Sequence, residues 1–290
     1  MLLASACGRL PNRKPDPVTL WLVTTSIVID SATLRPLPVQ ASDRQPARIS
    51  IVTTYQGSRY HPETVHALTE DPQVLAAAAG SFARAVALAG EGAFIDFQGA
   101  TPEELRSVTA MARAFADSAR AHSISPIGIV VPPADTVAFP SAVFARSIDY
   151  LVLRLGGEHR PGTSPGAPAS PNFIARQIGI RAREIGATRL IIEIPLSGFI
   201  WDRSGAARPI TFSAAQSRIA AESGTFSRDA TTGYLTATGR EGWTVWVPDA
   251  RTIETIIAAA RNSGVTRIAL SNSSGAAPDI TAWIQSTVRR

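Results

Sequence analysis

The sequence contains very little cysteine, histidine and lysine, and these scarcities exclude several kinds of protein. A single cysteine among 290 residues excludes an internal disulfide. The four histidines, at positions 61, 66, 122 and 159, lack the spacing of metal ligands, so we expect no metal site and no cofactor. No apolar run approaches the roughly 20 residues that a membrane-spanning helix needs.

Arginine carries almost all of the positive charge. The net charge is +5, and Lys14 is the only lysine. The arginines are scattered and form no basic stripe with interleaved aromatic residues, which is the pattern typical of a nucleic-acid-binding surface. We therefore expect a solvated, arginine-biased surface and no nucleic-acid partner, while the oligomeric state stays open.

The chain opens with the residues MLLASACG, which place Cys7 directly after small residues. This arrangement resembles the end of a bacterial lipoprotein signal peptide, in which the cysteine is lipidated. The apolar stretch is very short and no basic residue precedes it, so the alternative is an ordinary unpaired thiol. We expect residues 1–17 to be a signal remnant and a proline-rich tether. The membrane would then be reached only through a lipid anchor, on the periplasmic or extracellular face of the bacterial cell envelope.

From residue 18 onward, short apolar runs alternate with helical patterns, which is typical of a parallel α/β fold. The runs are continuous in Val, Ile and Leu, as expected for strands covered on both faces. Seven candidate strands are 19–24, 48–53, 93–97, 127–131, 150–155, 189–194 and 266–270. Helix starts are indicated by Thr101 with Glu104, by Ser170-Pro171 and by Asp249.

The stretch from about 211 to 247 breaks this alternation. It holds a short helical pattern and two β-prone runs separated by glycines, which predicts a small α+β insertion between late units of the fold. Residues 18–290 would form one domain that includes this insertion.

One predicted strand carries a known pattern. Residues 91–98 read EGAFIDFQ, which resembles the strand Asp-Gly-x-Asp-x-Asp-x-Glu of glycoside hydrolase family 18, the chitinase family. Asp96 falls on the third Asp and Gln98 on the catalytic Glu. Further segments resemble the family in the same order, namely 149–153, 194–201, 243–251 and 268–270, so that the resemblance covers about residues 18–285.

The resemblance implies a TIM-type (β/α)8 barrel. On a barrel strand, residues two apart face the same side, so positions 94, 96 and 98 would face the interior and the C-terminal mouth. Seven predicted strands leave two alternatives for the eighth. The first strand is missing or degenerate, or residues 19–29 contain two strands.

The resemblance also implies a chemistry that this sequence has altered. In the family the Glu protonates the leaving oxygen, and the neighbouring Asp orients the N-acetyl group of the substrate as the nucleophile. Gln98 is nearly isosteric with Glu but has no transferable proton. Gly156, Gly157 and Ser197 fall where the family has Tyr, Asp and Tyr, so Asp96 alone would survive from the catalytic set.

Three more residues are candidate substrate contacts. Trp201 follows a predicted strand, where an aromatic face at the barrel mouth could stack on a sugar. Arg154 and Glu158 lie at or just past another strand end, as polar contacts or as an ion pair with each other. Likewise, Asp96 and Gln98 either line a sugar site or are hydrogen-bonded remnants of the core.

We therefore expect a catalytically degenerate barrel that binds GlcNAc-containing glycans, such as peptidoglycan or chitin fragments. One alternative is an active glycosidase of the chitinase or N-acetylglucosaminidase type with a displaced acid, for which Glu91 or Glu158 is available. The other is a structural barrel that binds a protein partner through its helical exterior.

Overall fold

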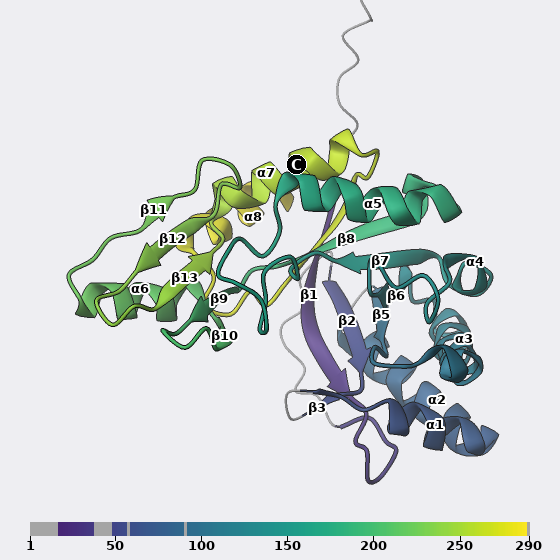
Figure 1. Ribbon diagram of the computed structural model, residues 1–290. Coiled ribbons are helices and arrows are strands. Elements are labelled where there is room, and N and C mark those ends of the chain that lie inside the picture. Colours follow the sequence, from purple (N-terminus) through teal and green to yellow (C-terminus); the bar gives the residue numbers. More distant parts are fainter. Residues whose placement is uncertain (1–16, 38–47, 57–58, 90–91, 289–290) are drawn as a thin grey trace, which may run out of the picture.

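Seven parallel strands close into a barrel (Figure 1). The computed structural model describes residues 17–37, 48–56, 59–89 and 92–288; Cys7, Lys14 and Glu91 lie outside these ranges. The predicted TIM-type barrel is confirmed. In spatial order its strands are β1 (Thr19–Val28), β14 (Arg267–Ser271), β8 (Leu190–Pro195), β7 (Tyr150–Arg154), β6 (Ile127–Val131), β5 (Gly92–Asp96) and β2 (Arg48–Thr53).

Strand β1 closes the barrel because it pairs with β14 on one side and with β2 on the other. Its first residues pair with β14, from Thr19 opposite Arg267, and the strand pairs with β2 along most of its length. The register shifts between Val23 and Thr25, which marks a bulge. The alternative of two strands within residues 19–29 is therefore wrong: one long strand serves both neighbours, and seven strands suffice to close the barrel.

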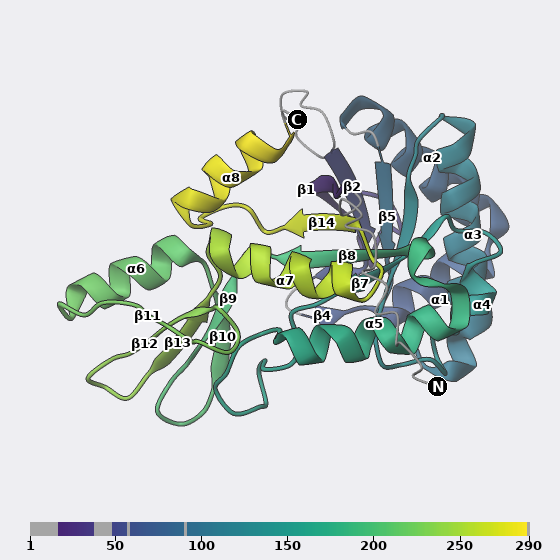
Figure 2. The same cartoon turned by 90° about the horizontal axis from the view of Figure 1, so that it is seen from above.

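Helices surround the barrel in the two views of Figures 1 and 2. The predicted starts of two of them carry the expected caps. Ser170 Oγ accepts a hydrogen bond from the Phe173 backbone N–H, and Asp249 caps its helix in the same way. The helices are α1 (Pro62–Glu70), α2 (Pro72–Ala89), α3 (Leu105–Ala121), α4 (Ser141–Phe144), α5 (Pro171–Ile185), α7 (Ala250–Asn262) and α8 (Pro278–Val288), with 3₁₀ turns at Pro102–Glu104 and Ala187–Arg189.

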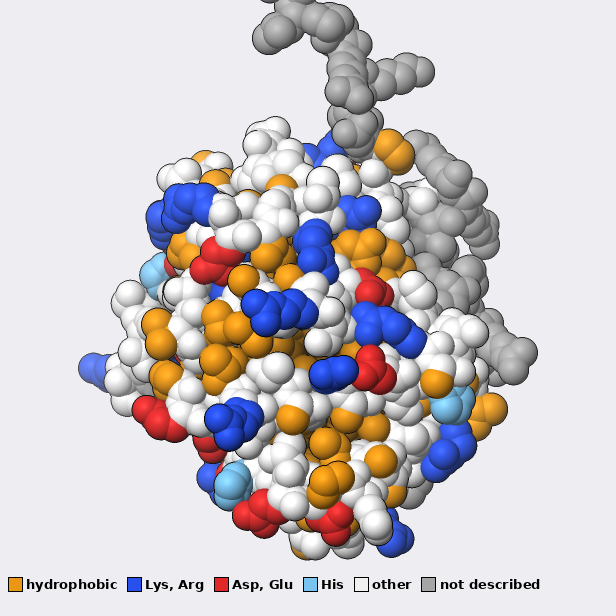
Figure 3. Space-filling model, turned by 90° about the vertical axis from the view of Figure 1, so that its right-hand side faces the viewer, with side chains coloured by type: hydrophobic (Ala, Val, Ile, Leu, Met, Phe, Trp, Pro, Cys, Tyr) orange, Lys and Arg blue, Asp and Glu red, His pale blue; other side chains and the backbone are white. Residues whose placement is uncertain are grey.

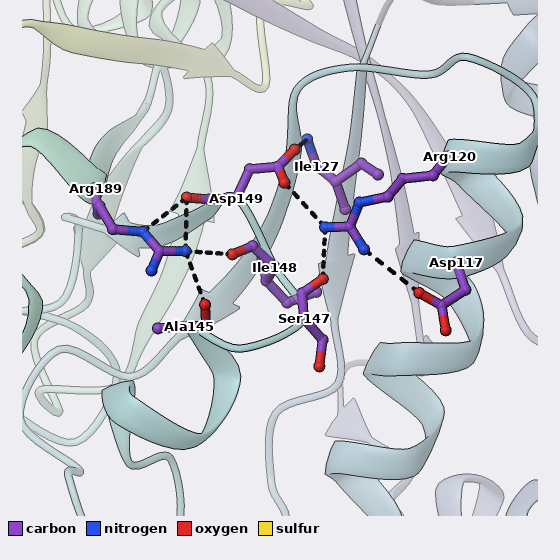
Figure 4. A network of polar contacts seen from close by, with 8 residues as sticks. All are labelled: Asp117, Arg120, Ile127, Ala145, Ser147, Ile148, Asp149 and Arg189. Atoms are coloured by element: carbon purple, nitrogen blue, oxygen red, sulfur yellow. Dashed lines mark hydrogen bonds and ion pairs between the residues drawn. The ribbon is translucent and has the colours of Figure 1, made fainter.

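Asp149 holds the N-terminal ends of two neighbouring strands together. Its Oδ2 accepts the backbone N–H of Ile127, the first residue of β6, at 3.1 Å, and its Oδ1 accepts Arg120 Nη2 at 2.9 Å (Figure 4). Arg189 donates to the carbonyls of Ala145, at 3.0 Å, and of Ile148 in the turn before β7. This network is far from the C-terminal mouth and fixes the base of the barrel.

The insertion is a five-stranded antiparallel sheet with one helix, and it projects from the side of the barrel away from α1–α4 (Figures 1 and 2). Its sheet order is β10 (Ala207–Ile210), β9 (Gly198–Trp201), β13 (Thr244–Val247), β12 (Leu235–Thr238) and β11 (Ser227–Arg228), and its helix is α6 (Phe212–Ala221). The sheet starts before the expected residue 211, because β9 follows β8 almost directly and only its antiparallel pairing separates the two.

Two hydrophobic cores flank the strands. The larger core fills the space between strands and helices. The smaller core fills the barrel interior and consists of Ile49, Ile51, Phe94, Val130, Val152, Ile191 and Ala269. Asp96, Arg154 and Glu193 stand two residues further along β5, β7 and β8 than members of this inner core. Polar side chains therefore replace apolar ones as the strands approach the C-terminal end of the barrel.

The face that carries α1–α4 shows basic and acidic side chains interspersed among apolar ones (Figure 3). In the described part of the chain, none of the helices combines the length and the apolar character needed to cross a membrane.

Candidate functional site

An open cavity of about 1000 Å³ lies at the C-terminal end of the barrel strands. Residues of every barrel strand or of the loop that follows it line this cavity, and residues of β9 and β10 extend one wall. Asp96, Gln98 and Arg154, three of the predicted site residues, line it together. Strand alternation predicted this for Asp96, the last residue of β5, and for Gln98, which lies in the turn that follows the strand.

Asp96 is buried at the floor of the cavity and accepts hydrogen bonds from three side chains. Tyr60 Oη donates to its Oδ2 at 2.9 Å, Arg154 Nη1 donates to the same oxygen at 2.8 Å, and Gln98 Nε2 donates to Oδ1 at 2.9 Å. Both carboxylate oxygens therefore already have partners. An Asp that must turn toward the N-acetyl group of a substrate would first have to leave this arrangement.

Arg154 bridges two buried carboxylates. Besides its contact with Asp96, its Nε donates to Glu193 Oε1 at 2.9 Å, and its Nη1 also lies 3.0 Å from Tyr60 Oη. Burial alone would lower the pKa of Arg154, but the charges of Asp96 and Glu193 outweigh it and raise that pKa well above the ordinary value. The guanidinium is therefore a permanent cation held between two acids.

Glu193 is a floor residue that the sequence analysis did not identify. Its side chain is 1% exposed, and its Oε2 is buried without a hydrogen-bond partner among the described residues. A charged residue inside the apolar run Leu190–Pro195 is an available signal, because burying a carboxylate is costly unless it is paired. The register that sets Glu193 opposite Arg154 explains the pairing.

Two tyrosines from a short hairpin form an aromatic wall of the cavity. The hairpin consists of β3 (Tyr55–Gln56) and β4 (Arg59–Tyr60), and the rings of Tyr55 and Tyr60 meet edge to face with centroids 5.0 Å apart. Burial and the charge of Asp96 raise the pKa of Tyr60 above its ordinary value. The phenol therefore stays protonated and donates a hydrogen bond to Asp96. Tyr55 is 46% exposed and presents an accessible ring to the cavity.

The prediction that Trp201 contacts a glycan is wrong. The indole is fully buried in β9, where its Nε1 donates to the carbonyl of Thr163 at 2.9 Å and its ring packs edge-on against Phe199. It therefore offers no face to a sugar. The sequence placed it in a loop because the pairing of β9 with β10 and β13 cannot be seen from a four-residue run.

The prediction that Glu158 is a substrate contact or the partner of Arg154 is also wrong. Its Oε2 accepts the Ser170 backbone N–H at 2.6 Å, and its Oε1 accepts Ser170 Oγ at 3.0 Å. Glu158 is not among the residues that line the cavity. It closes the loop that leads into α5, where a carboxylate near the positive end of a helix is favourable.

The three remaining positions of the expected degenerate set lie on the cavity wall. A Cβ added to Gly156 would come within 3.1 Å of Pro195 Cγ, so a larger side chain there would require Pro195 to move. Gly157 is exposed, and Ser197 Oγ accepts Asn272 Nδ2 at 3.4 Å. None of these positions supplies a phenol or a carboxylate to the floor.

The floor offers hydrogen-bonding groups of more than one kind. No group of three or more His, Cys, Asp or Glu residues in the described ranges could hold a metal. The two floor carboxylates are bridged by a cation, and as its partners they accept hydrogen bonds and donate none. Gln98, next to Asp96, offers an amide that both donates and accepts.

Comparison with known proteins identifies the fold. No family model and no curated protein matches the sequence. Among solved structures, the chain is similar to a chitinase from Chromobacterium violaceum, with 16% identity over 95% of this chain and 100% of that one and a TM-score of 0.72. It is also similar to the spore cortex-lytic enzyme SleL of Bacillus megaterium, with 12% identity over 95% and 75% of the chains and a TM-score of 0.72.

A third similar structure contains an oligosaccharide. It is a Glu-to-Gln mutant of class V chitinase from Nicotiana tobaccum in complex with NAG4, with 12% identity over 93% of this chain and 91% of that one and a TM-score of 0.68. At such identities the likeness establishes the fold, and it does so over nearly the whole chain. The protein therefore has a TIM-barrel fold similar to that of these chitinases.

Proposed function

We propose that the protein binds GlcNAc-containing glycans in the cavity at the C-terminal end of its barrel and does not hydrolyse them. One observation carries this proposal: the position of the family acid holds an amide, Gln98, whose Nε2 donates to Asp96 at 2.9 Å. General acid catalysis contributes about 10²–10⁴-fold to such reactions and requires a transferable proton. An amide at this point supports binding of a glycosidic oxygen without its protonation.

The state of Asp96 also supports the absence of hydrolysis. The family mechanism needs this Asp to orient an acetamide, but here both of its oxygens already accept hydrogen bonds, one from Arg154 and Tyr60 and the other from Gln98. The open cavity and the exposed ring of Tyr55 support retained binding, because aromatic faces pack well on sugar rings. The tobacco neighbour adds that an oligosaccharide occupies a barrel of this fold in which a glutamate is replaced by glutamine.

Calorimetry with GlcNAc tetramers tests the binding, and release of chromophore from a chromogenic chitooligosaccharide tests the chemistry. We expect heat of binding and no product. The absence of binding heat, in protein whose folding is verified by circular dichroism, would contradict the proposal and favour the structural barrel that binds a protein partner.

The second candidate function is an active glycosidase with a displaced acid. The observation in its favour is Glu193, a floor carboxylate with one oxygen that bonds to nothing in the described residues. The two acids suggested by the sequence support this function less well. Glu158 closes the loop before α5, and Glu91 lies outside the described ranges. Product release that both Glu193→Gln and Asp96→Asn abolish would establish this function in place of the first.

We also propose that Cys7 carries a lipid that anchors the protein to the bacterial cell envelope. The residues MLLASAC and the tether that follows support this proposal. Metabolic labelling with a fatty acid analogue tests it. Label that Cys7→Ser removes is the expected result, and an unlabelled wild-type protein in the soluble fraction would exclude the anchor.

A further inference from the structure

Two arginines on the cavity wall have no partner for their charge. Arg160 and Arg208 are exposed and line the cavity, and in the described ranges neither guanidinium makes a hydrogen bond or an ion pair. We call them the rim arginines. Arg154, in the same cavity, instead pairs with Asp96 and Glu193. Among the arginines that line the cavity, the rim arginines are therefore the two whose charge no carboxylate of the described residues offsets.

A chain of contacts places the rim arginines on neighbouring segments. The backbone N–H of Arg160 donates to Thr163 Oγ1 at 2.9 Å, and the Thr163 carbonyl accepts the indole N–H of Trp201 at 2.9 Å. Trp201 of β9 pairs with Ala207 of β10, directly before Arg208. The loop after β7 is thus fixed to β9, beside the edge strand β10 of the inserted sheet. Both arginines line the cavity, and Arg208, which pairs with Ile200 of β9, also lines a smaller pocket with Arg218 and Trp243.

The side chain of Arg160 lies beside Gly157 on the cavity wall. A Cβ added to Gly157 would lie 3.7 Å from Arg160 Cδ, so the arginine stem passes over this glycine, which also lines the cavity. Gly157 is the position that aligns with an Asp in the resembling family. The positively charged side chain of Arg160 therefore lies beside a position where the family has an Asp and this protein has a glycine.

We propose that the rim arginines form a subsite for a carboxylate carried by the glycan, so that the preferred ligand is an acidic GlcNAc-containing oligosaccharide and not neutral chitin. This inference rests on the proposed glycan binding and specifies its substrate class. A planar guanidinium matches a carboxylate in bidentate geometry, and such charge-assisted bonds are roughly twice as strong as neutral ones. The carboxylate comes from a lactyl ether, as in muramic acid, or from a uronic acid, and the two sources share this chemistry.

Calorimetry on the full chain with three tetrasaccharides tests the proposal. The probes are neutral GlcNAc tetramer, an alternating GlcNAc–MurNAc tetramer with its lactyl carboxylates, and an alternating GlcNAc–glucuronate tetramer. We expect at least one acidic probe to bind about tenfold more tightly than the neutral probe at low salt. We also expect that preference to shrink as salt is added, because the contact is exposed.

Substitutions of the rim arginines distinguish a specific carboxylate subsite from an effect of the protein's net charge. Arg160→Ala with Arg208→Ala should abolish the preference for the acidic probes over the neutral probe, and Arg160→Lys with Arg208→Lys should restore part of it. Arg203→Ala is the matched control, because this exposed residue lies in the turn between β9 and β10 and does not line the cavity. It should leave the preference intact.

Each remaining outcome decides a specific point. Neutral and acidic probes of equal affinity would overturn the carboxylate subsite and leave glycan binding standing. An equal loss of preference in Arg203→Ala would also overturn it, because the effect would then come from net charge. If none of the probes bound, both the subsite and the proposed function would be overturned.

Discussion

Arg154 Nη1 lies 2.8 Å from Asp96 Oδ2, and these residues come from strands that the sequence separates by 58 positions. The same guanidinium reaches Glu193 at 2.9 Å. One cation thus binds the surviving acid of the expected catalytic set and a second acid that the sequence analysis did not identify. This pairing joins the charged residues of the floor into one polar cluster.

Restoring the acid alone should not restore hydrolysis. Gln98→Glu would supply a proton donor, but Asp96 would still be bound by Arg154 and Tyr60 and would not orient an acetamide. We expect no release of product from a chromogenic chitooligosaccharide by Gln98→Glu, with Gln98→Ala as the control. Turnover by Gln98→Glu would show that Gly156, Gly157 and Ser197 do not prevent hydrolysis.

Removing the bridging cation should destabilise the barrel. In Arg154→Met, Asp96 and Glu193 would remain buried without a counter-charge, and breaking a buried pair costs about 3–5 kcal/mol. Because the Arg154 side chain is 29% exposed, we expect the lower end, about 3 kcal/mol, in urea unfolding. Arg160→Met, at the exposed rim, should change the free energy of unfolding by less than about 0.5 kcal/mol. Equal effects of the two substitutions would contradict the role of Arg154 as the bridge.

Tyr55 should contribute to ligand affinity and not to stability. Its ring is 46% exposed in the cavity and rests edge-on against Tyr60. Tyr55→Ala should raise the Kd for the GlcNAc tetramer roughly tenfold, from lost stacking and apolar contact. Tyr55→Phe keeps the ring and should bind almost as the wild type does. Unchanged affinity of Tyr55→Ala in calorimetry would remove this tyrosine from the site.

Trp201, unlike Tyr55, should contribute to stability and not to ligand affinity. Trp201→Phe removes the indole N–H that bonds to the Thr163 carbonyl, and we expect a loss of about 1–3 kcal/mol in the free energy of unfolding. Affinity for the neutral tetramer, measured by calorimetry well below the unfolding transition, should stay within about twofold of wild type, since a 0.4 kcal/mol change corresponds to a factor of about two. A stable variant with much weaker binding would revive the direct contact that the burial of the indole excludes.

Acid should destabilise the protein partly through Asp249. Burial works to raise the pKa of Asp249, but hydrogen bonds from Arg228 and Thr252 outweigh it, and its pKa lies below the ordinary value. A carboxyl with a lowered pKa in the folded state stabilises that state above its unfolded pKa of about 3.9. This contribution is lost as the pH falls through the lower folded pKa.

Urea unfolding between pH 7 and pH 2.5 measures this effect. Asp249→Asn keeps a side chain that caps α7 but removes the charge. The variant should therefore be less stable than wild type at pH 7, and the difference should shrink below about pH 4. Asp117→Asn, on the exposed surface of α3, is the control and should follow the wild-type curve. A constant difference across the whole range would contradict the linkage.

Local patterns determined much of the fold. The seven apolar runs correspond to the seven barrel strands, and the caps at Ser170 and Asp249 mark helix starts, because strand burial and capping are read from neighbouring residues. The alternation along β5 likewise placed Asp96 and Gln98 on the cavity side. These features depend on the identity of residues within a few positions of each other.

The pairing of distant strands could not be predicted from neighbouring residues. The sequence left Arg154 as either a ligand contact or the partner of Glu158, four residues away. Only the alignment of β7 with β8 brings Glu193 beside it, and only the pairing of β9 inside the inserted sheet buries Trp201. The sequence by itself thus determined the barrel and the two polar residues that follow the pleat of one strand. Tertiary structure decided which charges meet on the floor, because register between strands depends on contacts across the whole closed sheet.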